Sequence, residues 1–180
     1  PVSTAAALVR TSFPKLLAPT MTDILAKIAK NPPLNCFLMK STRHCVYYTR
    51  KLRYFVQFFD FVPKIYDAKN RCIEPSELKA LCLESEPNQN VVLAALNSSL
   101  FFIFFTTFSD VRNVNRRDIE LFPFDLGALG AELVSELTRL AHMLMADFEE
   151  KSSYLTNDYK AHGVLKIQTF QPRESKPVID

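Results

Sequence analysis

Glycine is scarce in this sequence and tryptophan is absent. The 180 residues contain three glycines and no tryptophan. Glycine supplies the tight turns of loop-rich sandwiches and the backbone of phosphate-binding loops, so its scarcity argues against both. With 48% hydrophobic residues, a chain of this length can bury a core without the help of metals or disulfides.

The four cysteines lack the spacing of a metal site. No CxxC pair occurs among Cys36, Cys45, Cys72 and Cys82, whereas zinc sites usually contain at least one close ligand pair. Because no signal peptide is visible, we expect reduced thiols and a cytoplasmic protein. The chain begins at Pro1 without an initiator Met, and we interpret it as a piece of a longer protein.

Hydrophobic patterning predicts an α+β fold. Strand-forming residues gather at 46–48, 54–58, 78–83 and 164–170. Residues 90–108 are apolar nearly all round, as in a helix buried in a core. Leucines recur at helical spacing along 126–152. We therefore expect a small mixed β-sheet packed around a long buried helix, plus a long amphipathic C-terminal helix.

Three segments follow from this pattern. Residues 1–19 are an irregular lead-in, 20–125 form the α/β core, and 126–180 form the amphipathic helix and a C-terminal extension. Residues 91–108 approach the length of a membrane span, which needs about 20 apolar residues. The polar run Asn97-Ser98-Ser99 at their centre favours a buried helix instead, so we expect no membrane partner.

The chain carries no convincing catalytic or metal motif. Asn31-Pro32-Pro33-Leu34 is close to the Asn-Pro-Pro-aromatic motif of adenine methyltransferases, but it lacks the aromatic ring that would stack on the base. We interpret the diproline as a helix stop. The three histidines are scattered and none belongs to a hydrolase signature. We assign no catalytic, cofactor-binding or metal-binding residue.

Positive charge is concentrated in the first 53 residues. They contain nine Lys or Arg against the single acid Asp23, while the remainder is net acidic; such asymmetry suggests a polyanionic partner. Two clusters combine cations with amides, the residue types that contact phosphates and base edges. The candidate DNA-binding residues are Lys40, Arg43, Arg50, Lys51, Arg53, Arg112, Asn113, Asn115, Arg116 and Arg117.

The order of several motifs resembles one family. The segments are Val46-Tyr47-Tyr48-Thr49-Arg50, Arg53-Tyr54-Phe55, Ala95-Leu96-Asn97-Ser98-Ser99-Leu100-Phe101, Ser109-Asp110-Val111-Arg112-Asn113-Val114-Asn115 and Phe122-Pro123. In this order they resemble the C-terminal target-recognition region of adenine-specific DNA methyltransferases of bacterial restriction-modification systems. The likeness extends over about residues 20–180.

The resemblance implies a division of labour. An upstream domain of the same chain would bind S-adenosylmethionine and methylate adenine, and this chain would clamp double-stranded DNA and select its sequence. The first cluster would grip phosphates, the 112–117 loop would enter a groove, and Asn97 would bond backbone at a helix–sheet contact. The alternatives are a protein-interaction or specificity-subunit module without methyl transfer, and a membrane-associated protein.

Overall fold

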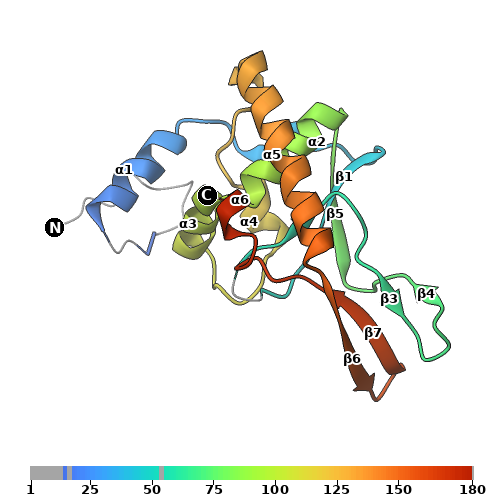
Figure 1. Ribbon diagram of the computed structural model, residues 1–180. Coiled ribbons are helices and arrows are strands. Elements are labelled where there is room, and N and C mark those ends of the chain that lie inside the picture. Colours follow the sequence, from blue (N-terminus) through green and yellow to red (C-terminus); the bar gives the residue numbers. More distant parts are fainter. Residues whose placement is uncertain (1–13, 16–17, 53–54, 180) are drawn as a thin grey trace.

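The structure is a computed structural model that describes residues 14–15, 18–52 and 55–179, and it is an α+β fold (Figure 1). The α-helices are α1 Pro19–Ile28, α2 Glu86–Leu96, α3 Ser99–Phe108, α4 Arg116–Glu120, α5 Ala131–Glu150 and α6 Lys176–Ile179. The 3-10 turns are η2 Leu34–Phe37 and η3 Leu126–Ala128. The strands are β1 His44–Thr49, β2 Phe58–Phe59, β3 Ile65–Tyr66, β4 Cys72–Ile73, β5 Leu78–Leu83, β6 Ser153–Tyr159 and β7 Gly163–Thr169.

The strands form two antiparallel sheets rather than the single mixed sheet that we expected. The first has the order β2-β1-β5, and the second has the order β4-β3-β7-β6. In the second sheet Ile65 pairs with Ile167, so the C-terminal segment completes a sheet begun by the core segment. The hairpin of β6 and β7 projects from the body beside β3 and β4 (Figure 1).

The long buried helix expected over 90–108 is wrong in one respect: it is two helices bent by 63°. Asn97 ends α2, and Ser98 caps α3 by accepting a hydrogen bond from the Phe101 N–H at 3.2 Å. Side-chain caps of this kind satisfy the free N–H groups at a helix start, so the polar run is a helix boundary. Among the described residues no single helix is long and apolar enough to cross a membrane, although this bent pair passes the length and composition test.

The core lies between the first sheet and these two helices. Val92, Leu93 and Leu96 of α2 are fully buried, as are Phe101 and Phe105 of α3. Asn97 is 1% exposed and bridges the layers. Its Oδ1 accepts from the Phe58 N–H at 3.1 Å, and its Nδ2 donates to the Phe58 carbonyl at 3.0 Å. The expected role of Asn97 at a helix–sheet contact is confirmed.

Helix α5 packs on α2 with only half of its length. Ala141, Leu144, Met145 and Phe148 are buried, whereas Leu133 in its first turn is 47% exposed. The N-terminal end of α5 extends beyond the rest of the molecule (Figure 1). Intramolecular packing therefore covers the second half of the apolar stripe, whereas in the first half Leu133 is exposed and Leu137 is half-buried.

The expectation for the cysteines needs correction. The thiols of Cys45 and Cys82, paired residues of β1 and β5, are joined in a disulfide rather than reduced, while Cys36 and Cys72 are free and exposed. Most of the expected lead-in, residues 1–13 and 16–17, lies outside the described residues.

Candidate nucleic-acid interface

The end of strand β1 meets the polar loop between α3 and α4. Lys51 forms an antiparallel bridge with Asn113, and the Val114 N–H donates to the Arg50 carbonyl at 2.8 Å. The loop therefore runs as an extra extended segment beside residues 50–51. Because Val114 is 3% exposed and belongs to the core, its apolar side chain anchors the C-terminal part of the loop.

A side-chain contact reinforces this junction. The Arg50 Nη2 donates to the Asn115 Oδ1 at 3.2 Å, and the Asn115 Nδ2 donates to the Asn113 carbonyl at 3.4 Å. Arg50 and Asn115 are 65 residues apart in the chain, so folding unites residues from both sequence clusters. The surface formed by Arg50, Lys51, Arg112, Asn113, Asn115 and Arg116 is called the β1-end surface below.

The cations of the β1-end surface are exposed and lightly held. Lys51 pairs with Glu77 at 3.2 Å, with side chains 68% and 61% exposed. Arg116 Nε pairs with Glu120 at 2.7 Å, and its Nη1 donates to the Ala80 carbonyl at 3.4 Å. Exposed ion pairs contribute at most about 1 kcal/mol, so a phosphate can replace either carboxylate as partner at little cost.

Asp110 orders the tip of the loop. Its Oδ1 accepts from the N–H groups of Arg112 at 2.9 Å and Asn113 at 3.2 Å. These hydrogen bonds lower the pKa of the Asp110 carboxyl, and the one from the Arg112 N–H has the larger effect. Val111 at the tip has a φ of 60°, a left-handed conformation that is unfavourable for a β-branched residue. The side chains of Arg112 and Asn113 donate no hydrogen bond to any residue that the structure describes.

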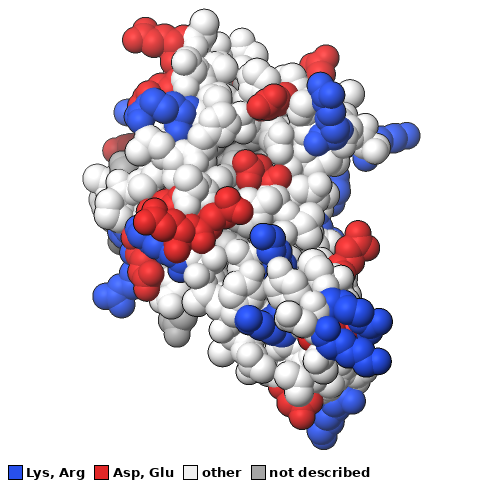
Figure 2. Space-filling model, turned by 45° about the vertical axis from the view of Figure 1, so that its right-hand side comes forward, with Lys and Arg blue, Asp and Glu red and all other residues white. Residues whose placement is uncertain are grey.

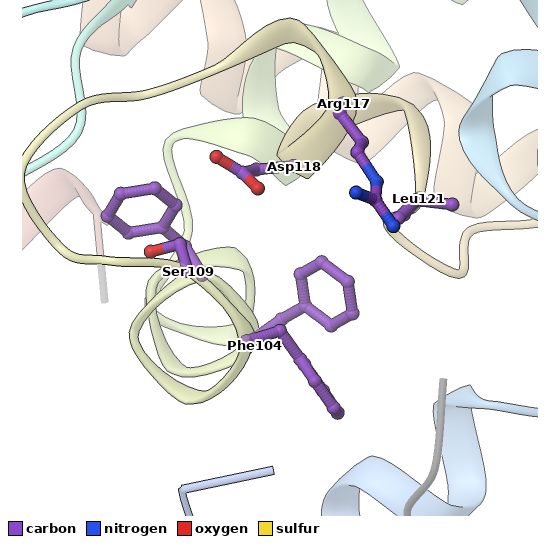
Figure 3. Close-up of a pocket in the computed structure, with 7 residues that line it drawn as sticks. Phe104, Ser109, Arg117, Asp118 and Leu121 are labelled. Carbon is purple, nitrogen blue, oxygen red and sulfur yellow. The ribbon is translucent and has the colours of Figure 1, made fainter. Parts of the chain in front are cut away.

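The remaining candidate residues lie elsewhere. Lys40 and Arg43 precede β1, and this six-residue strand separates them from Arg50 by about 20 Å. Arg117 extends from α4 toward a pocket of about 110 Å³ between α3 and α4, which is also lined by Phe104, Ser109, Asp118 and Leu121 (Figure 3). Burial raises the pKa of the Asp118 carboxyl. Arg53 lies outside the described residues.

The diproline segment is a structural element. Pro33 bridges to Pro123, the Leu34 N–H donates to the Phe122 carbonyl at 2.8 Å, and the Phe124 N–H donates to the Pro32 carbonyl at 2.9 Å. The prolyl carbonyl that would hold a target amine in a methyltransferase motif thus bonds to backbone here. Within the described part of the chain, no three His, Cys, Asp or Glu side chains gather as a metal site would require.

Sequence reasoning missed a basic region in the second sheet. Figure 2 shows Lys and Arg side chains gathered on the lower lobe, where Figure 1 places β3, β4, β6 and β7. The basic residues of these two hairpins are Lys64, Lys69, Arg71, Lys160 and Lys166. Three of them fall within residues 64–71. This local cluster was overlooked because the residues after position 53 were considered together, and their net charge is negative.

A cleft of about 380 Å³ separates the two sheets. Lys51 and Glu77 line it on the side of the first sheet, and Tyr159, His162 and Leu165 line it on the side of the second. The β1-end surface and the second sheet are therefore neighbours across one opening.

Comparison of the chain with known protein families, curated proteins and solved structures gives no match. The functional argument therefore rests on the residues and contacts described above.

Proposed function

We propose that this chain binds double-stranded DNA and selects its sequence, as the target-recognition part of an adenine-specific DNA methyltransferase. The observation that supports the proposal most strongly is the Arg50–Asn115 contact, which joins two distant basic, amide-bearing segments at one exposed surface. The order of motifs that resembles the target-recognition region supplies the methyltransferase context.

The residues of the β1-end surface have complementary tasks. Lys51 and Arg50 neutralise phosphates, and Asn115 fixes the direction of the Arg50 guanidinium. Arg112 and Asn113, on a loop ordered by Asp110, read base edges. Arg suits the two acceptors of guanine, and Asn suits the acceptor and donor of adenine. Methyl transfer from S-adenosylmethionine is the task of an upstream domain, and no step of it is assigned to residues of this chain.

Single substitutions separate base reading from phosphate binding. A wrong base pair costs about 1–3 kcal/mol in specific complexes. Arg112→Ala and Asn113→Ala should therefore flatten the sequence preference in a selection from random duplexes. Lys51→Ala should weaken all duplexes alike and reduce the slope of log K against log salt by about 1. Lys27→Ala on α1, an exposed lysine far from this surface in the sequence, is the matched control.

Two results would overturn the proposal. One is a binding experiment in which the chain binds duplex DNA, but Arg112→Ala, Asn113→Ala and Lys51→Ala all have the same affinity, salt slope and sequence preference as Lys27→Ala. The other concerns the methyltransferase context. If the upstream reading frame encodes neither a Gly-rich strand-to-helix turn nor an Asn-Pro-Pro-aromatic motif, the methyltransferase part of the proposal fails and only DNA binding remains.

One feature favours a second candidate, a protein-interaction module. Leu133 and Met143 of α5 are 47% and 45% exposed, and uncovered apolar side chains on a helix suit a protein partner. The two proposals differ in the effect of Leu133→Lys, which weakens a protein complex through α5 but leaves DNA binding by the β1-end surface unchanged.

A further inference from the structure

The second sheet has two chemically different faces. Side chains alternate across a strand, so Ile65, Leu165 and Ile167 point to one face and line the cleft between the sheets. The opposite face contains Tyr66 and its cross-strand partner Lys166. Because the face with Ile65, Leu165 and Ile167 lines the cleft, the face with Tyr66 and Lys166 points away from it. It is called the outer hairpin face below.

Aromatic rings and cations are combined on the outer hairpin face. The rings of Tyr66 and Tyr154 lie 5.9 Å apart, and the Lys166 Nζ lies 4.9 Å from the Tyr154 ring centroid. Lys64 precedes Tyr66 by two residues and therefore shares its face. The Lys64 N–H donates to the Gln168 Oε1 at 3.0 Å. The Gln168 N–H donates to the Lys64 carbonyl at 2.9 Å, which extends the pairing of β3 with β7 to Lys64.

The turn between β3 and β4 adds charge in a defined conformation. The Asp67 Oδ1 accepts from the N–H groups of Lys69 and Arg71, each at 2.9 Å, and Arg71 Nη2 pairs with Asp67 at 2.7 Å. Residues 64–73 and 153–169 together contain five Lys or Arg against two acids, Asp67 and Asp158. All five cations are exposed, and Lys and Arg dominate this lobe in Figure 2.

We propose that the outer hairpin face is a second DNA-backbone contact, which binds phosphates in addition to those held by the β1-end surface. The inference rests on the proposed function. Lys51 of the β1-end surface and His162 of the turn between β6 and β7 line the same cleft, so the turn of the hairpin that carries the outer hairpin face lies next to the β1-end surface. Lys64, Lys69, Lys160 and Lys166 supply charge without base reading, which makes the added affinity independent of sequence.

The test compares two double variants of equal charge in the whole chain. Lys64→Ala with Lys166→Ala removes two cations from the outer hairpin face, and Lys27→Ala with Lys30→Ala removes two from α1 and the turn after it. The readout is log K for a duplex against log salt. Each lost phosphate contact lowers the slope by about 0.9, so the hairpin variant should lose about 1.8 units of slope and keep its sequence preference. The α1 variant should lose less than about half a unit, since it loses no contact.

The outcomes separate this inference from the proposed function. If the hairpin and α1 variants behave alike while Arg50→Ala with Asn115→Ala loses binding, the outer hairpin face is not a contact and the proposed function stands. If the unmodified chain binds no duplex, both fall. If the unmodified chain binds vesicles of anionic phospholipid more tightly than duplex, and only the hairpin variant loses that binding, the face serves a membrane surface and the inference is overturned.

Discussion

At the scale of single residues, Asn97 connects the helical layer to the first sheet. Both polar groups of its amide are used on the Phe58 backbone, at a site 1% exposed. Asn97→Ala leaves the N–H and carbonyl of Phe58 buried without these partners, so we expect the free energy of unfolding to fall by about 2–4 kcal/mol. Urea denaturation measures the change. Asn35→Ala, at an exposed amide, is the control, and an equal effect of both variants would contradict the assigned role.

Val111 is a residue whose backbone conformation opposes its side chain. Its φ of 60° lies in the left-handed region, which Asn tolerates much better than a β-branched residue. Val111→Asn should therefore raise the free energy of unfolding by about 1 kcal/mol. Thermal denaturation against Val62→Asn, a change at a similarly exposed valine without positive φ, isolates the backbone effect. No gain at 111, or an equal gain at 62, would show that the loop is not strained.

At the scale of elements, the disulfide joins the two long strands of the first sheet. Cys45 and Cys82 are 37 residues apart in the chain, and closing a loop of that size stabilises a fold by about 3–4 kcal/mol. Reduction should lower the urea midpoint of the unmodified chain. It should leave the urea midpoint of the double variant Cys45→Ser with Cys82→Ser unchanged, because that variant has no disulfide to reduce. Thiol titration of the denatured, unreduced chain should find two thiols, those of Cys36 and Cys72. Finding four thiols would show that all four cysteines are reduced, as expected from sequence, and that the disulfide is absent.

Helix α5 is expected to respond differently along its length. Leu144 is 4% exposed and Leu133 is 47% exposed, although both belong to the same leucine stripe. Leu144→Ala should cost about 2–5 kcal/mol of stability. Leu133→Ala should change it by no more than about 0.5 kcal/mol. Urea denaturation of the two variants measures both changes. A large loss of stability in Leu133→Ala would mean that the first half of α5 is covered by the chain itself.

Elements with a strong local pattern were predictable from sequence, and elements that depend on distant partners were not. The alternating residues of β5 and the leucine spacing of α5 located both. Strand β6 is exposed along most of its length, so it has no hydrophobic alternation and was missed. Asn97-Ser98 was noticed as polar, but a bend of 63° depends on capping at both helix ends, which periodicity does not report.

The candidate site was predictable in composition only. Basic and amide residues were identified in two clusters, and the structure brings Arg50 and Lys51 to Asn113 and Asn115. It leaves Lys40 and Arg43 at the other end of β1. Which cations share a surface depends on strand direction and on the pairing of the 109–115 loop, and these are long-range contacts that residue types cannot reveal.

At the scale of the whole molecule, the C-terminal segment completes the structure that the core segment begins. Strand β7 pairs with β3, and Ala141, Leu144 and Phe148 of α5 bury themselves against α2 and the Phe-rich core. Residues 126–180 were expected to form the amphipathic helix and a C-terminal extension outside the α/β core. If they merely extended the core, a chain ending at residue 125 would fold by itself.

The shortened chain should instead fail to unfold cooperatively. Without α5 the apolar surface of α2 is open to water, at about 25 cal/mol for each Å² exposed, and the two-residue strands β3 and β4 lose the seven-residue partner that orders them. Thermal denaturation followed by circular dichroism should give a broad, non-cooperative change for residues 1–125. Adding residues 126–180 as a separate polypeptide should restore a cooperative transition, because the missing contacts lie in that segment. A sharp transition for residues 1–125 alone would place the folding unit, and with it the β1-end surface, entirely within the first 125 residues, and the outer hairpin face would then be a separable attachment.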